Sequence, residues 1–263
     1  MLKLQHKLEY AINLGVDFLL RNVNEDGIIA DEDNIHRHSL AALCLAENIK
    51  DSSDRLNLVL SRIASCTYSN KSSFFIIDEN ESSKNDVNAI AAMVFFKTKK
   101  QDWGEKYANT VMKEMNSDDS AGICCRMFIK AYEILEEKRW LEKAKDCAYQ
   151  ILEDGKLSDL WNMIALNELD RHHVDERFRN FTISMISNHP TFDIYANYGK
   201  FFGSDWKEKI QMLAYENLEL QQSPSNEWKG GAFLDEYGKA RIDWTQRYVN
   251  SFSRCLKILK KVV

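Results

Sequence analysis

Two kinds of helix-like segment alternate along this chain, and the alternation recurs about every 35 residues. One kind opens on polar residues and then becomes small and apolar on nearly every side, as at 39–43 and 89–93. The other kind keeps one charged face, as at 140–146. A helix that is apolar all round is buried on all sides, whereas a one-faced helix covers the outside of a core. The pattern therefore predicts an inner and an outer layer of helices.

Six polar openings precede the apolar segments, and they predict six helical hairpins with twelve helices in all. Only two prolines and ten glycines interrupt the helical pattern. We predict an all-α (α/α)6 toroid with inner and outer rings, as a single domain over residues 1–263. A straight solenoid of the same hairpins is the alternative, although the first and last segments look like partners that close a ring. The openings lie at 33–38, 84–88, 118–122, 158–162, 191–197 and 241–246.

Long connections lead from each outer segment to the next inner one, whereas the return connections are short. The long connections lie at 22–33, 67–84 and 222–240. They gather the N-termini of the inner helices, with their unpaired N–H groups and positive dipole ends, around one mouth. Long loops on a rigid scaffold carry binding and catalytic residues. The functional site is therefore predicted at this mouth.

Charge and hydropathy narrow the classes of partner. A net charge of −5 gives no basic stripe for nucleic acid. No stretch approaches about 18 uninterrupted apolar residues, so no membrane span is predicted. Residues 1–10 lack the apolar core of a signal peptide, and we predict a cytoplasmic protein. The oligomeric state stays open.

The cysteines and histidines argue against a metal site. No Cys-x-x-Cys spacing occurs, and the adjacent Cys124 and Cys125 suit neither a zinc clip nor a simple bridge. His36 and His38 are two residues apart, so they point to different sides of a helix. We predict six reduced thiols, no metal and no cofactor.

Two turns resemble those of known α/α toroids. The run Phe-Leu-Leu-Arg-Asn-Val-Asn-Glu-Asp-Gly at 18–27 resembles their Leu-Leu-x-Asn-Gln-x-x-Asp-Gly opening, and 218–222 followed by 228–233 resembles the same turn. Terpenoid cyclases, protein prenyltransferases, uronyl epimerases and unsaturated glycuronyl hydrolases share this turn. The segment 230–246 resembles the closing element of sugar-related bacterial toroids. The resemblance implies the toroid fold over the whole chain.

The chain departs from several subfamilies. The Asp-x-Asp-Asp motif of protonating terpene cyclases and the full Gln-x-x-x-Gly-x-Trp repeat are absent. The zinc-binding set of prenyltransferases cannot be assigned, and the zinc motifs of lanthionine cyclases are missing. A shared fold does not bring a shared chemistry, so the subfamily stays open.

The predicted mouth combines aromatic rings, carboxylates and amides, which suits a sugar-like ligand. Rings cover the apolar face of a sugar, while carboxylates and amides bind its hydroxyl groups. Paired carboxylates, or a His–Asp pair where the ring closes, are candidates for acid/base catalysis. The catalytic candidates are Asp243, His36, Asp193 and Asp86. The candidates for substrate binding are Trp161, Tyr195, Tyr198, Asn197, Arg126, Gln246, Arg247, His38 and Trp228.

Structural roles compete with these assignments. The acidic residues also suit helix N-caps, the aromatic residues also suit packing, and Arg241, Asp243 and Arg247 also suit an ion pair that closes the ring. The leading hypothesis is a carbohydrate-active enzyme of the lyase, hydrolase or epimerase type acting on a small-molecule or oligosaccharide substrate. An isoprenoid cyclase or transferase and a non-catalytic binding or scaffold protein are the alternatives.

Overall fold

The structure is a computed structural model in which the chain forms two compact units. Residues 1–61 and 190–263 form the first unit, and residues 62–189 form the second. The prediction of a single domain remains a prediction. The structure describes residues 2–29, 34–49, 53–70, 73–76, 85–115, 120–155, 160–188, 192, 196, 206–223, 225, 229–235 and 237–260.

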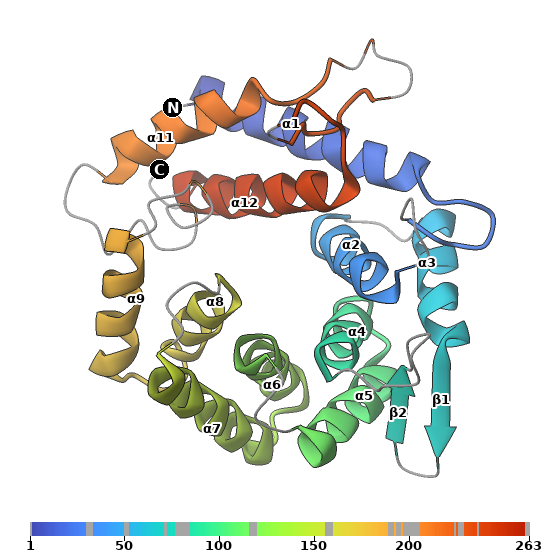
Figure 1. Ribbon diagram of the computed structural model, residues 1–263, viewed down its shortest axis with the longest axis vertical. Coiled ribbons are helices and arrows are strands. Elements are labelled where there is room, and N and C mark those ends of the chain that lie inside the picture. Colours follow the sequence, from blue (N-terminus) through green and yellow to red (C-terminus); the bar gives the residue numbers. More distant parts are fainter. Residues whose placement is uncertain are drawn as a thin grey trace. The chain divides into compact units, whose positions relative to one another are not determined.

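In the first unit, the last helix packs against the first two. Helix α12 (Ile242–Lys260) contacts α1 (Leu2–Arg21) and α2 (Ile35–Asn48), and α11 (Trp206–Leu218) lies along α1 (Figure 1). Helix α3 (Asp54–Ser65) begins in this unit and continues into the second. The expected partnership of the first and last segments is thereby confirmed.

Helices α1 and α12 run antiparallel at close range. Gln5 Nε2 donates to the Leu259 carbonyl oxygen at 3.2 Å, near one end of the contact. Near the other end, a Cβ atom added to Gly15 would lie 2.4 Å from Val249 Cγ2. Real Cβ atoms do not approach another atom so closely, so a glycine at this position allows the two helices to touch.

The second unit has two helical layers (Figure 1). Helices α4 (Asn85–Lys97), α6 (Ala121–Leu135) and α8 (Leu160–Leu169) pack in series. Helices α5 (Gln101–Glu114), α7 (Lys138–Asp154) and α9 (Glu176–Asn188) cover them. Every residue of α4 except Asp86 and Lys97 is buried, whereas the buried residues of α7 follow the three- and four-residue spacing of a single face. This contrast confirms the inner and outer pattern within the unit.

The long connection at 67–84 contains a feature that the helical pattern does not predict. Strands β1 (Thr67–Asn70) and β2 (Ser73–Ile76) form an antiparallel hairpin. The ring of Phe74 packs edge-on against Trp103 at a centroid distance of 4.8 Å, and Thr110 Oγ1 donates to the Phe74 carbonyl oxygen at 2.6 Å. Contacts with α5 therefore hold this hairpin in place.

The described residues contain eleven helices. The inner helix expected from the opening at 191–197 lies outside them, apart from Phe192 and Ala196, which are helical and buried. The other eleven of the twelve predicted helices are confirmed.

Two loop glycines dock on the main chain of a neighbouring helix. Gly27 has φ +82°, and an added Cβ would lie 2.3 Å from the Leu58 carbonyl oxygen of α3. Gly231 has φ +89°, and an added Cβ would lie 2.2 Å from the Leu14 carbonyl oxygen of α1. Both the left-handed φ and the close approach require glycine. The two turns that resemble each other in sequence thus share the same contact, a glycine with positive φ packed against a helix main chain.

All six cysteines are free thiols, and all except Cys66 are buried. Burial raises the pKa of Cys147 and of Cys255 to about 12. No group of three or more His, Cys, Asp or Glu residues in the described part of the chain is placed to hold a metal ion. None of the described helices combines the length and the apolar character that a bilayer crossing requires.

Candidate functional site

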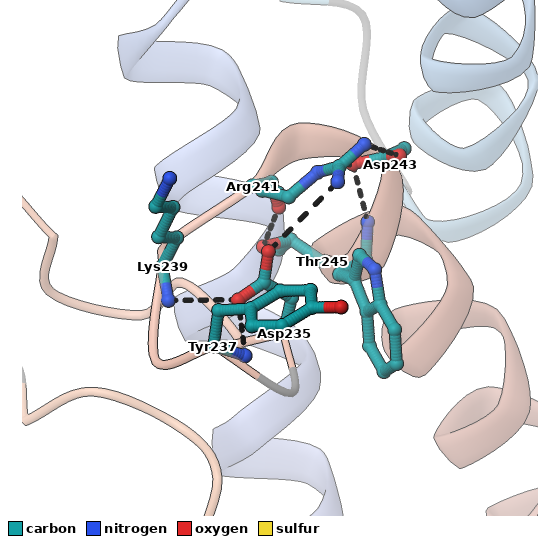
Figure 2. Close-up of polar contacts among 7 residues, drawn as sticks. Asp235, Tyr237, Lys239, Arg241, Asp243 and Thr245 are labelled. Carbon is teal, nitrogen blue, oxygen red and sulfur yellow. Dashed lines mark hydrogen bonds and ion pairs between the residues drawn. The ribbon is translucent and has the colours of Figure 1, made fainter.

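An arginine–carboxylate pair marks the start of α12. Arg241 Nε donates to Asp243 Oδ1 at 2.9 Å, and Arg241 Nη2 donates to Asp243 Oδ2 at 2.6 Å (Figure 2). The Trp244 amide also donates to Asp243 Oδ1, at 3.1 Å. A bidentate pair with a backbone contact fixes the orientation of the carboxylate. Asp243 therefore has a defined direction at the first turn of the helix.

A buried carboxylate supports this pair from the preceding loop. Asp235 Oδ1 accepts the amides of Tyr237 at 3.0 Å and Lys239 at 2.9 Å (Figure 2). Its Oδ2 lies 3.8 Å from Arg241 Nη1. The turn from 235 to 239, with Gly238 at φ +72°, and the guanidinium of Arg241 are thus held by one side chain.

The loop and the helix are also joined through a threonine. Thr245 Oγ1 donates to the Arg241 carbonyl oxygen at 2.7 Å and accepts the Phe233 amide at 3.0 Å. Both bonds are local to the loop–helix junction, so the position of Asp243 follows from the fold of residues 233–245.

Gln246 lies three residues beyond Asp243, so the two share one helix face. Its exposed fraction is only 9%, yet its Oε1 accepts no hydrogen bond from any residue that the structure describes. A buried amide oxygen without a donor costs free energy. The side chain of Gln246 is thus suited to a ligand that supplies a hydroxyl group.

Aromatic rings flank the same region. The ring of Trp244 lies 5.8 Å from that of Tyr248, and the guanidinium of Arg247 lies 5.7 Å from the Trp244 ring. Tyr237, on the turn that Asp235 holds, is 78% exposed. An exposed aromatic ring on a turn that is held by hydrogen bonds to Asp235 is suited to stacking on the apolar face of a ligand.

The first turn of α2, in the same unit as α12, contains His36, the second titratable group of the predicted set. Cys44 Sγ donates a hydrogen bond to the Gln246 carbonyl oxygen at 3.6 Å, and Asn48 Nδ2 donates one to Asn250 Oδ1 at 3.1 Å. Both pairs are 202 residues apart, so α2 and α12 run parallel in this register. The same offset places Asp243 opposite Ala41, and His36 lies five residues before Ala41 on α2, about 7.5 Å along the axis of that helix.

His38 is held by the core. Its Nδ1 accepts the Ile29 amide at 3.4 Å, so its Nε2 carries the proton and donates to the Val59 carbonyl oxygen at 3.3 Å. The residue is buried. Since main-chain groups occupy both ring nitrogens, a packing role describes His38 better than the predicted role in substrate binding.

Arg126 forms a second arginine–carboxylate pair, within the second unit. Its Nε lies 3.2 Å from both carboxylate oxygens of Glu168, and its guanidinium lies 5.5 Å from the ring of Trp161. An added Cβ at Gly122 would lie 2.5 Å from the Asn162 amide nitrogen, so α6 and α8 approach closely here. These contacts place Arg126 and Trp161 together, while their role in substrate binding stays a prediction.

Asp86, on α4, holds the start of the next inner helix, α6. Its Oδ1 accepts the amide of Ser120, the N-cap residue of α6, at 2.9 Å. The carboxylate of Asp86 thus caps a neighbouring helix, which agrees with the capping alternative more than with a catalytic role.

Five of the predicted site residues lie outside the described residues: Asp193, Tyr195, Asn197, Tyr198 and Trp228. Their assignments remain predictions.

Two residues, Asp235 and Glu168, were missed by the sequence reasoning. Asp235 precedes Tyr237 and Gly238 in a pattern typical of a side-chain-capped turn, which is a signal that could have been found. Glu168 lies seven residues after Trp161, on the same helix face, but its pairing with Arg126 depends on a contact between separate helices.

Comparison with known proteins supports the fold. No family model matches the chain, and no curated protein matches its sequence. The solved structure of D-mannose isomerase is similar over 97% of this chain and 97% of its own, with 12% identity and a TM-score of 0.68. A novel alpha-amylase from Clostridium perfringens is similar over 94% of this chain and 97% of its own, with 10% identity and a TM-score of 0.63.

The GH76A alpha-1,6-mannanase from Salegentibacter sp. HEL1_6 is similar over 98% of both chains, with 12% identity and a TM-score of 0.60. At these identities the likeness shows the fold alone. The chain has the (α/α)6 toroid fold, as the hairpin pattern predicts.

Proposed function

We propose that the protein is a carbohydrate-active enzyme whose site includes the start of α12. The observation that carries this proposal is the buried and unsatisfied Oε1 of Gln246, three residues from a carboxylate that Arg241 orients. An amide acceptor beside an oriented carboxylate provides two hydrogen-bond acceptors for hydroxyl groups of a sugar. A hydrocarbon chain offers neither of them a donor.

The remaining groups of the site fit the same ligand. Tyr237 presents an exposed ring on a turn that is fixed by Asp235. Stacking on such a ring stabilises the apolar face of a sugar, while Arg241 keeps Asp243 directed to the polar face. The three similar structures are named as an isomerase, an amylase and a mannanase, all of which act on carbohydrates by their names.

We assign Asp243 the transfer of a proton to or from the bound sugar, as lyase, hydrolase and epimerase reactions all require. His36 is the proposed second acid/base group. Because its level on α2 differs from that of Asp243 on α12, the two would act on different atoms of a substrate between them. The untested residues Asp193, Tyr195, Asn197, Tyr198 and Trp228 stay proposed as further parts of the site.

The test begins with ligand binding by the wild-type chain. The probes are mannose, α-1,6-linked manno-oligosaccharides and malto-oligosaccharides, with farnesyl diphosphate as the isoprenoid comparison. Saturation-transfer NMR reports binding, and the proton spectrum of the sugar reports turnover over several hours. Binding with turnover of at least one sugar is expected, whereas binding of only the isoprenoid would overturn the proposal.

Variants then locate the site. Asp243→Asn keeps the shape of the side chain but removes its proton transfer, and a loss of turnover of about 100-fold or more is expected. Gln246→Leu should weaken sugar binding about 10-fold, because a hydroxyl donor loses its acceptor. Asp146→Asn, an exposed change on α7, is the matched control and should change neither value. Sugar binding without turnover by the wild type would instead indicate a binding protein.

A further inference from the structure

A cleft beside the C-terminal end of α1 is separate from the site at α12. Its volume is about 430 Å³, and it lies wholly within the first unit. It shares no residue with the proposed sugar site. The lining residues are Leu14, Asp17, Leu20, Arg21, Arg55 and Gly230.

Two arginines of this cleft are held by main-chain oxygens. Arg55 Nη1 donates to the Leu20 carbonyl oxygen at 2.6 Å, and Arg21 Nη2 donates to the Gly230 carbonyl oxygen. Each bond occupies one of the several N–H donors of a guanidinium. The structure gives the remaining N–H donors no partner among the described residues, so they are available to a ligand in the cleft.

Neither arginine forms an ion pair with any carboxylate in the described part of the chain. This sets them apart from Arg126, Arg177 and Arg241, each of which pairs with an acidic side chain. Two like charges at one cleft repel each other, and an anion between them relieves this repulsion. Fixed guanidinium groups lose little freedom when they bind such an anion.

We propose that this cleft binds a small ligand through a phosphate or carboxylate group held between Arg21 and Arg55. Leu14 and Leu20 supply an apolar wall for the body of the ligand. Asp17 is the one acidic residue among the described residues of the lining, and it opposes the anion. The proposal does not depend on the function of the α12 site, because it concerns different residues and a charged group.

The first experiment compares three probes by isothermal titration and by chemical-shift changes at low salt. Inorganic phosphate and glucuronate should bind in the millimolar range or tighter, and glucose should not bind at this cleft. Binding of phosphate alone would assign a phosphorylated ligand, and binding of glucuronate alone would assign a carboxylate; either result supports the proposal. No binding of either anion up to about 50 mM would overturn it. This limit corresponds to an affinity too weak to be specific.

Variants that should weaken or strengthen anion binding test whether this cleft is the binding site. Arg21→Gln and Arg55→Gln keep an N–H donor for the main-chain oxygen but lose the charge, and each should weaken anion binding about 10-fold. Asp17→Asn should strengthen the same binding several-fold. Arg171→Gln, an exposed change in the second unit, is the control and should leave the affinity unchanged. If the arginines only cap α1, all four variants would bind the anions as the wild type does, and the proposal would be wrong.

Discussion

The two units each contain an arginine paired with a carboxylate, and the pairs are built differently. Arg126 and Glu168 are 42 residues apart and join α6 to α8, with side chains 6% and 21% exposed. Arg241 and Asp243 are two residues apart at one helix start, with side chains 40% and 33% exposed. The first pair connects helices. The second pair holds a carboxylate at a surface where a ligand can reach it.

The energetic consequences of the two designs differ. A buried pair is costly to break because the remaining partner keeps its charge in a poorly solvated place. A half-exposed pair is worth little to stability because water solvates both partners. The Arg241–Asp243 pair can therefore serve a function without a large cost to stability, whereas the Arg126–Glu168 pair mainly stabilises the packing of α6 against α8.

Removing Arg126 is expected to have the largest effect. Arg126→Ala should lower the free energy of unfolding by about 3 kcal/mol, the low end for a broken buried pair, because Glu168 is partly exposed. Urea unfolding measures this loss. Arg139→Ala, in an exposed pair with Glu105, is the control and should cost less than about 1 kcal/mol. Equal effects of the two changes would contradict the comparison.

Thiol labelling shows where that loss occurs. Buried Cys124 and Cys125 lie in the same helix as Arg126, and burial raises the pKa of Cys125 well above its usual value. In native Arg126→Ala these two thiols should react with an alkylating reagent faster than Cys255 of the first unit does. In the wild type, Cys66 should react first.

Removing Asp235 should have an intermediate effect. Asp235→Ala leaves the amides of Tyr237 and Lys239 without their acceptor, which costs about 1–3 kcal/mol. Thermal unfolding measures the loss. The change should also lower turnover, because Arg241 loses a support behind Asp243. Full activity with lowered stability would show that the turn does not position the site.

Breaking the pair at α12 should change stability little. Arg241→Gln and Asp243→Asn should each cost less than about 1 kcal/mol, and a double-mutant cycle should give a coupling energy in the same range. The corresponding cycle for Arg126 and Glu168 should give at least about 2 kcal/mol, because that pair is buried. A large coupling at α12 would assign the pair a structural role.

The smallest effect on stability is expected for a third arginine–carboxylate pair, Asp175 and Arg177. Asp175 and Arg177 are also two residues apart, with Arg177 Nη2 2.6 Å from Asp175 Oδ2. Hydrogen bonds from Arg177 lower the pKa of Asp175 to about 2. The stabilisation is therefore complete above the unfolded value of about 3.9 and is lost as the pH falls toward 2. Asp175→Asn should flatten the dependence of the melting temperature on pH between about 4 and 2, whereas Asp146→Asn should not.

The layered fold could be predicted because it follows from local periodicity. The run at 89–93 is apolar on every side, and α4 is buried on every side. The hairpin of β1 and β2 could not be predicted, since its four-residue strands depend on Phe74 packing against Trp103 of a later helix. Short strands carry too little pattern of their own.

The site could be predicted where it is local. Asp243 and Gln246 share a face of one helix, and helical spacing alone reveals this. The role of His38 depends on Ile29 and Val59, and the role of Asp86 depends on Ser120 of another helix. Such partners are distant in sequence or in a separate element, so residue type and spacing do not identify them.

The packing of α1 against α12 also constrains how the chain is made. About 220 residues separate the end of α1 from the start of α12. At typical rates of about 5–20 residues per second, the ribosome needs roughly 10–45 s to supply the partner. The second unit is continuous in sequence and can collapse within that interval. Until α12 emerges, the main helix contacts of α1 are those with α2 and, late in synthesis, with α11, so part of its apolar face, which includes Leu4, Leu8 and Ile12, stays exposed on the nascent chain.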